Sequence, residues 1–136
     1  MLLKSGTFMA NLSGNWLGTY WQLGVATRFE VTLIHSGNTL SGNILDDGSL
    51  GEAQLSGEVI GRSIQFTKRY LTQSHYSIIY TGTLSESEDF MQGQWRIGSS
   101  NLGSINSGQW EARRGGLDLM VSWKARLAEP VGGSKS

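Results

Sequence analysis

The chain has 136 residues, with 11 Lys and Arg against 11 Asp and Glu, so its formal net charge is zero. This length predicts one domain with one core, and the neutral charge is unlike that of a nucleic-acid-binding domain. No apolar run is long enough to cross a bilayer as a helix, so we expect neither nucleic acid nor a membrane as a partner. The absence of cysteine excludes disulfides, thiol catalysis and Cys-based metal sites.

The start of the chain bears on its compartment. A secretory signal peptide carries an apolar stretch of about 7 to 15 residues. The opening sequence MLLKSGTFMANLSG lacks such a stretch. A cytoplasmic location is therefore the default expectation, with a secreted mature chain as the alternative.

Eight segments alternate apolar and polar residues with the period of two that is typical of strands buried on one face. In RFEVTLIH, for example, Phe29, Val31 and Leu33 share one face, while Glu30 and Thr32 share the other. The predicted strands lie near 13–22, 27–36, 39–46, 52–60, 62–71, 74–85, 90–98 and 106–114. Turn-rich sequences such as HSGN and DDGS separate them. The series predicts an all-β fold, an eight-stranded antiparallel up-and-down barrel whose closure removes free sheet edges.

Glycine is unusually frequent, at 19 of 136 residues. Six glycines share the template x-x-Gly-x-apolar, and the alternation places all of them on the apolar face: Gly14, Gly42, Gly57, Gly82, Gly93 and Gly108. Inside a small barrel, glycine lets a strand coil sharply and makes room where opposing walls would collide. The triplet Gly-Gln-Trp, at 93–95 and again at 108–110, indicates that neighbouring strands meet the same crowding. The alternative is a two-sheet sandwich with glycines at bulges.

The sequence GGLDLMVSWKARLAEP has two interpretations. It fits a helix with Leu117 and Val121 on one stripe, which would cover a barrel end or a partner's surface. It also fits an alternating strand, which would pair in a dimer or replace 106–114 as the closing strand of the barrel. We assign residues 1–114 to a single barrel domain and residues 115–136 to a partly ordered tail carrying this helix or extra strand.

The motifs GNWLG, FEVTLIHSGNTLSG, QLSGEV, GRSIQFTKRY, IIYTGTL and GQW resemble those of the calycin barrels. Their order and spacing over most of 14–98 are most similar to the avidin and streptavidin family, and more distantly to lipocalins. The resemblance implies an eight-stranded barrel that binds a small molecule and pairs barrel against barrel in a homo-oligomer. It also implies that Trp16 packs against Arg114 from the last strand to close the barrel.

The aromatic positions of that family match better than its polar ones. Phe66, Tyr80 and Trp95 fall where avidin-like proteins place aromatic rings around biotin. Gly18 and Ile44 stand where the family has a biotin-binding Asn and Tyr. A buried ureido group left without such partners would cost about 1–3 kcal/mol for each unpaired polar atom. The resemblance therefore implies the fold without implying biotin.

The candidate ligand-binding residues are six side chains expected to face the barrel interior: Phe66, Lys68, Tyr70, Tyr76, Tyr80 and Trp95. Lys68 is the most informative, because lysine is rarely buried unless it is paired. It would either lie near the rim with its ammonium group in water or contact an anionic group of a ligand.

Other titratable residues give no catalytic or metal pattern. His35 and His75 each stand alone on a predicted strand, and Asp46, Asp47 and Glu52 flank the turn DDGS. We interpret these residues as structural, and we expect no catalytic residue, metal or cofactor.

Three functions remain. The first is binding of an unidentified small molecule in an aromatic-lined cavity of about 300 Å³ or more. The second is a protein-interaction or inhibitor module, in which the barrel is filled and the SSNLGS loop or the tail makes the contact. The third is an isomerase- or lyase-type enzyme, which requires two titratable groups within hydrogen-bond reach around the cavity.

Overall fold

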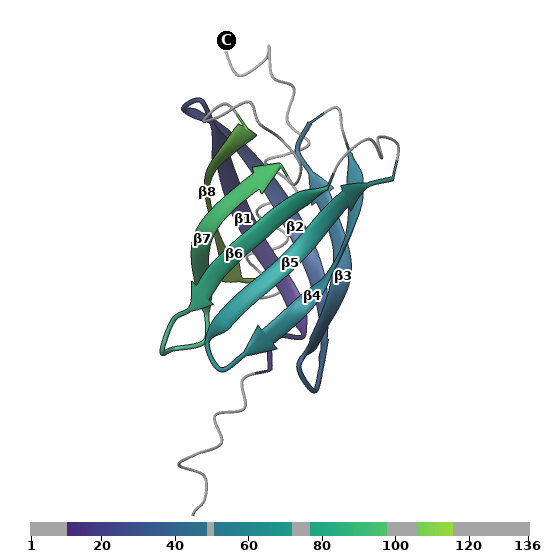
Figure 1. Cartoon of the computed structure of the whole chain (residues 1–136), viewed down its shortest axis with the longest axis vertical. Coiled ribbons are helices and arrows are strands. Elements are labelled where there is room, and N and C mark those ends of the chain that lie inside the picture. Colours follow the sequence, from purple (N-terminus) through teal and green to yellow (C-terminus); the bar gives the residue numbers. More distant parts are fainter. Residues whose placement is uncertain (1–10, 49–50, 72–76, 98–105, 116–136) are drawn as a thin grey trace, which may run out of the picture.

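The computed structural model describes residues 11–48, 51–71, 77–97 and 106–115. Eight strands form the described fold: β1 (Gly14–Gln22), β2 (Val25–Ser36), β3 (Thr39–Asp46), β4 (Glu52–Ile60), β5 (Ser63–Tyr70), β6 (Ile78–Leu84), β7 (Phe90–Ile97) and β8 (Ser107–Arg114). Each strand pairs antiparallel with the next, and β8 pairs with β1 (Figure 1). Among the described residues, no helix is long and apolar enough to cross a membrane.

The predicted eight-stranded antiparallel barrel is confirmed, and the sandwich alternative is wrong because the sheet closes on itself. Strand β8 pairs with β1 from Trp16 opposite Arg114 to Tyr20 opposite Trp110, so the closing strand is 107–114. The alternative that 117–127 closes the barrel is therefore wrong. Residues 116–136 lie outside the described part of the chain, and the division into a barrel and a tail stays a prediction.

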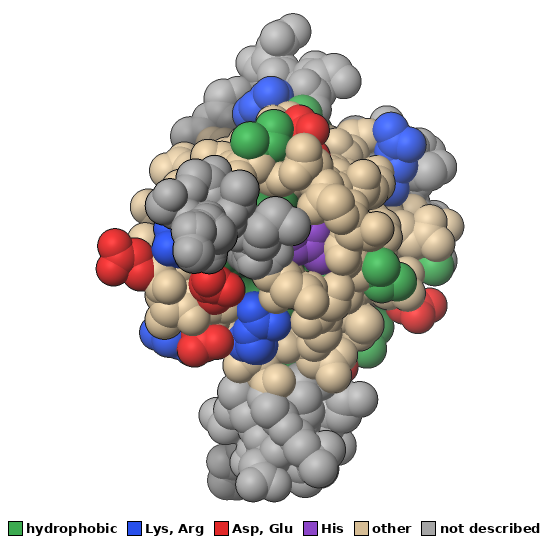
Figure 2. All heavy atoms as spheres, turned by 90° about the horizontal axis from the view of Figure 1, so that it is seen from below, with side chains coloured by type: hydrophobic (Ala, Val, Ile, Leu, Met, Phe, Trp, Pro, Cys, Tyr) green, Lys and Arg blue, Asp and Glu red, His purple; other side chains and the backbone are tan. Residues whose placement is uncertain are grey.

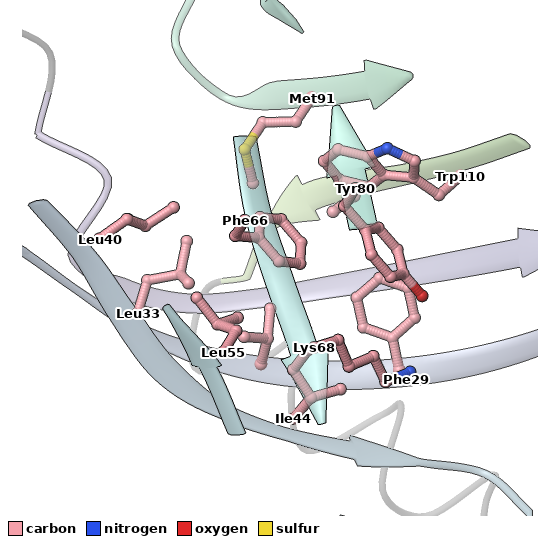
Figure 3. Close-up of a pocket in the computed structure, with 12 residues that line it drawn as sticks. Phe29, Leu33, Leu40, Ile44, Leu55, Phe66, Lys68, Tyr80, Met91 and Trp110 are labelled. Atoms are coloured by element: carbon pink, nitrogen blue, oxygen red, sulfur yellow. The ribbon is translucent and has the colours of Figure 1, made fainter. Parts of the chain in front are cut away.

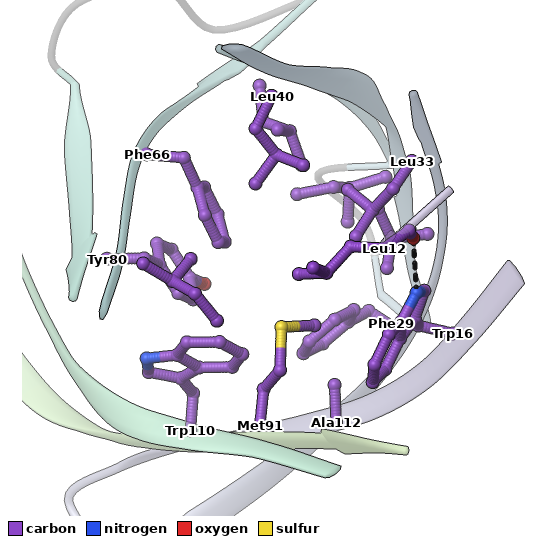
Figure 4. Packing of buried hydrophobic residues seen from close by; sticks show 14 of the residues in the cluster. Leu12, Trp16, Phe29, Leu33, Leu40, Phe66, Tyr80, Met91, Trp110 and Ala112 are labelled. Atoms are coloured by element: carbon purple, nitrogen blue, oxygen red, sulfur yellow. Dashed lines mark hydrogen bonds between the residues drawn. The ribbon is translucent and has the colours of Figure 1, made fainter. Parts of the chain in front are cut away.

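One end of the barrel is closed by side chains. Leu12 and Trp16 are fully buried there, and the indole nitrogen of Trp16 donates a hydrogen bond to the Leu12 carbonyl at 2.9 Å (Figure 4). The backbone N–H of Leu12 donates to Nδ1 of His35 at 3.1 Å. The guanidinium of Arg114 lies 4.6 Å from the centre of the Trp16 ring and donates to three backbone carbonyls. The structure thus places Trp16 and Arg114 in the contact that the resemblance implies.

Figure 2 views the molecule from this closed end. On the described part of this face, charged side chains of both signs lie apart and form no single charged patch. Beside the closed end, Arg114 also lies 3.5 Å from the carboxylate of Asp89. We call the opposite end, where β1, β3, β5 and β7 finish, the mouth of the barrel.

The tryptophan of each Gly-Gln-Trp triplet packs over a glycine of another strand. Trp95 lies over Gly108 of the next strand, where an added Cβ would come within 2.7 Å of the indole nitrogen. Trp110 likewise lies over Gly82, where an added Cβ would come within 2.8 Å of the indole ring. Each indole N–H then donates at 3.0 Å to a backbone carbonyl, Trp95 to Trp21 and Trp110 to Thr81. This is the crowding that the repeat indicates.

Gly14 does not follow the other template glycines. It is exposed, and no atom lies within 4 Å of the position its Cβ would occupy. Its φ is +127°, a conformation that side chains rarely adopt. The prediction that Gly14 relieves crowding inside the barrel is therefore wrong, and its conformation at the start of β1 explains the glycine.

Candidate functional site

The interior of the barrel is nearly filled by its own side chains. The cavity at its centre has a volume of about 10 Å³, room for about one water molecule (Figure 3). Phe66 stacks on Tyr80 with ring centres 4.8 Å apart and meets the edge of Trp110 at 5.8 Å. The interior therefore lacks the cavity of about 300 Å³ that the first function requires, because aromatic rings occupy the space that the inward glycines leave.

An ion pair lies buried toward the mouth. The ammonium of Lys68 lies 3.0 Å from each carboxylate oxygen of Asp46, and both side chains are 1% exposed. Neither expectation for Lys68 is correct, since its ammonium is neither in water nor free for an anionic ligand. Asp46 does flank the turn after β3, as predicted, but its side chain also forms this buried ion pair. Burying two charges costs several kcal/mol per ion before their attraction offsets it, so such a pair is weak evidence for a role in stability alone.

The strand register explains why these two residues meet. Asp46 ends the inward face of β3, and Lys68 lies on the inward face of β5. Between them, β4 contributes Ala53, which pairs with Ile44 on one side and Tyr70 on the other. Because alanine has a short side chain, Asp46 can reach across β4 to the side chains of β5.

Two tyrosine hydroxyls complete the shell around the carboxylate. Tyr70 and Tyr20 both donate to Oδ2 of Asp46, Tyr20 at 3.1 Å. The Lys68 ammonium also lies 4.7 Å from the centre of each of these two rings. Burial lowers the pKa of Lys68, and the Asp46 carboxylate opposes that effect. We call Asp46, Lys68, Tyr70 and Tyr20 the Asp46 network.

The two tyrosines of the Asp46 network, together with Tyr80, predict how the stability of the barrel changes at alkaline pH. Burial raises the pKa of Tyr20, Tyr70 and Tyr80 above the ordinary value of 10.0, and the charge of Asp46 adds to the effect. A raised folded-state pKa means that the stabilisation is fully present below about pH 10 and is lost as the pH rises further. We expect these three tyrosines to stay protonated in the native barrel at pH values where free tyrosine ionises, and we expect stability to fall there.

The measurement is an ultraviolet absorbance titration of tyrosinate, with the protein in denaturant as the control. All four tyrosines should titrate near pH 10 in denaturant. Ionisation of two or more tyrosines in the folded protein at that pH would contradict the prediction.

A pocket opens above this network at the mouth. The volume of this pocket is about 60 Å³. That is room for roughly four to six waters at ~10–15 Å³ each, which is similar to the size of one small ring. Its walls are Tyr20, Gln22, Tyr70, Ile78, Tyr80, Trp95 and Ile97. We call this the mouth pocket.

The structure divides the six predicted ligand-binding residues. Tyr70, Tyr80 and Trp95 line the mouth pocket, whereas Phe66 and Lys68 line the small interior cavity. Tyr76 lies outside the described residues. In the part of the chain that the structure describes, no group of His, Asp or Glu could hold a metal ion.

Sequence reasoning missed the role of Asp46 and assigned Tyr20 no ligand contact. A signal for Asp46 was present, because Leu40, Gly42, Ile44 and Asp46 alternate on one face of the predicted strand. That alternation makes Asp46 an inward acid near the end of its strand. An inward lysine on another strand was its natural partner.

A broad hollow of about 730 Å³ lies outside the barrel, over β6, β7 and β8. It includes the backbone of the paired glycines Gly82 and Gly93. Most other lining residues, such as Thr83, Gln92 and Gln94, are polar. This lining is typical of a solvated sheet face.

Comparison with known proteins provides information on the fold alone. No protein-family model matches the chain, and no curated protein matches it. A solved structure that is similar is that of EF1p2_mFAP2b bound to DFHBI, with a TM-score of 0.57 and 12% sequence identity. The likeness covers 76% of this chain and 94% of that chain. At this identity it supports the barrel fold alone.

Proposed function

We propose that this barrel binds a small molecule, about one ring in size, in the mouth pocket. The observation that carries the proposal is the pocket itself, whose walls include Tyr80 and Trp95 together with Tyr20 and Tyr70, the two tyrosines that bond to Asp46. Mostly apolar walls with a few placed polar groups are typical of ligand sites. The similar barrel EF1p2_mFAP2b holds the small molecule DFHBI, which supports a binding role for this fold. We also propose that the chain is related to the calycins, and to the avidins in particular.

Binding fits the Asp46 network better than catalysis does. Asp46 and Tyr70 meet the geometric requirement of the enzyme hypothesis, since they are titratable groups in direct hydrogen-bond contact. The Asp46 carboxylate, however, already accepts hydrogen bonds from Lys68, Tyr70 and Tyr20. Burial raises the pKa of Tyr70 far above neutrality, so this hydroxyl keeps its proton. A network that holds its protons is suited to binding rather than to proton transfer.

The filled interior favours a second candidate, the protein-interaction or inhibitor module. A cavity of about 10 Å³ leaves the barrel as a solid scaffold apart from the mouth pocket. The SSNLGS loop and the tail, which we expect to make such a contact, lie largely outside the described residues. The two candidates differ in whether the mouth pocket itself takes up a small molecule.

The test is binding of toluene and 4-methylphenol as probes, measured by ligand-detected NMR, with native mass spectrometry for any molecule that purifies with the protein. Ile97 is half-buried on the pocket rim, so Ile97→Trp should fill the pocket and weaken probe binding about tenfold or more. The matched control is Ile60→Trp, since Ile60 is 60% exposed at the end of β4, away from the mouth. Absence of binding to the wild type, or equal binding by both variants, would leave the scaffold as the better function.

A further inference from the structure

The direction of the hydrogen bonds around Asp46 limits what the mouth pocket can recognise. An ionised carboxylate only accepts hydrogen bonds. The Tyr70 hydroxyl therefore donates its proton to Oδ2 of Asp46, and the Tyr20 hydroxyl donates to the same oxygen or to the Tyr70 oxygen at 3.5 Å. Only lone pairs remain on these two oxygens, and both residues line the pocket. The pocket thus offers two acceptors, each polarised by the carboxylate behind it.

Tyr80 adds a group of the opposite kind. Its side chain is 2% exposed, and it lines both the interior cavity and the mouth pocket. Within the part of the chain that the structure describes, its hydroxyl makes no hydrogen bond, although its ring stacks on Phe66. Figure 3 shows this side chain reaching from β6 toward Phe29 and the end of Lys68. A tyrosine hydroxyl can donate as well as accept a hydrogen bond, so this one has a proton available for a ligand in the pocket.

The charges around the pocket are balanced. Lys68 neutralises Asp46 at a distance of 3.0 Å. All the residues that line the pocket are uncharged: Tyr20, Gln22, Tyr70, Ile78, Tyr80, Trp95 and Ile97. The ammonium of Lys68 is held against both oxygens of the carboxylate, so it does not attract a ligand anion. The pocket therefore suits a neutral molecule.

We propose that the ligand of the mouth pocket is a neutral phenol, whose hydroxyl donates to Tyr20 or Tyr70 and accepts from Tyr80. A phenol combines a flat ring, which fits beside Trp95, with one group that is both donor and acceptor. A ring without a hydroxyl leaves the Tyr80 proton unpaired, and an ether leaves the acceptors unused. This inference rests on the proposed function, because it names the chemical class of the ligand for the same site.

The test compares 4-methylphenol with 4-fluorotoluene, two probes of nearly the same size. We expect the wild type to bind 4-methylphenol at least about tenfold more tightly, the effect of one or two satisfied hydrogen bonds. A purely apolar pocket gives the opposite order, because burying an unpaired hydroxyl is costly. Tyr80→Phe should remove most of the preference by weakening the binding of 4-methylphenol. Ile60→Trp, which lies away from the mouth, should keep the wild-type preference and is the control.

The outcomes separate the two proposals. If neither probe binds the wild type, the proposed small-molecule function fails. If 4-fluorotoluene binds as tightly as 4-methylphenol, or more tightly, the function stands and the phenol inference is overturned. If the preference for 4-methylphenol survives unchanged in Tyr80→Phe, the role assigned to Tyr80 is overturned.

Discussion

Replacing Lys68 with methionine should destabilise the barrel by about 3–5 kcal/mol at neutral pH, the cost of leaving a buried charge without its partner. The variant keeps a side chain of similar length, so the packing against Phe29 and Tyr80 changes little. The carboxylate of Asp46 would then keep only the hydroxyls of Tyr70 and Tyr20 as partners. Because two neutral donors cannot offset the lost ammonium, the negative charge becomes the main penalty.

The charge origin of this loss can be tested by removing the carboxylate. The double variant Lys68→Met with Asp46→Asn should be more stable at neutral pH than Lys68→Met alone. Urea denaturation of both variants measures the difference.

The matched control is Arg69→Met on the next residue of β5. Arg69 is exposed and donates to the hydroxyl of Ser77 at 3.1 Å, so its replacement should cost less than about 1 kcal/mol. A loss for Lys68→Met that is no larger than this, or one that Asp46→Asn does not reduce, would contradict the role assigned to the buried pair.

Replacing Gly93 with alanine should destabilise the barrel by about 3 kcal/mol or more, because the new methyl group has no space. An added Cβ would lie 1.8 Å from the carbonyl oxygen of Thr81 and 2.5 Å from the Cα of Gly82. Both atoms belong to the backbone of the neighbouring strand. Relief therefore requires β6 and β7 to separate, which strains the hydrogen bonds of their ladder.

Gly48→Ala is the control for the loss of glycine itself. No atom lies within 4 Å of its Cβ position, and its φ lies outside the left-handed region. Alanine there should leave the free energy of unfolding within about 0.5 kcal/mol of the wild type or raise it slightly. Thermal and urea unfolding of both variants check the pair. Equal stabilities for the two variants would show that the interior is not crowded at Gly93.

The strands were predictable because their signal is local. Alternation along a segment such as RFEVTLIH states which residues face inward without reference to any other strand. The structure places β2 at Val25–Ser36 and β4 at Glu52–Ile60, close to the predicted 27–36 and 52–60. Barrel closure also followed, since eight such strands joined by short turns have few other ways to bury one face.

The candidate site was predictable only in part. The inward direction of Tyr70, Tyr80 and Trp95 followed from alternation, and all three line the mouth pocket. The partner of Lys68 did not follow, because Asp46 lies 22 residues away and two strands across. The size of the cavity did not follow either, since it depends on how side chains from opposite walls interlock.

By itself, the sequence determined the eight strands, their inward faces and the need for glycine where those faces crowd. These properties depend on period and residue size along a single segment. Only the tertiary structure decided that the interior is filled, that Asp46 neutralises Lys68 and that a small pocket remains at the mouth. Those properties depend on the register between strands, which sets the side chains that meet across the barrel.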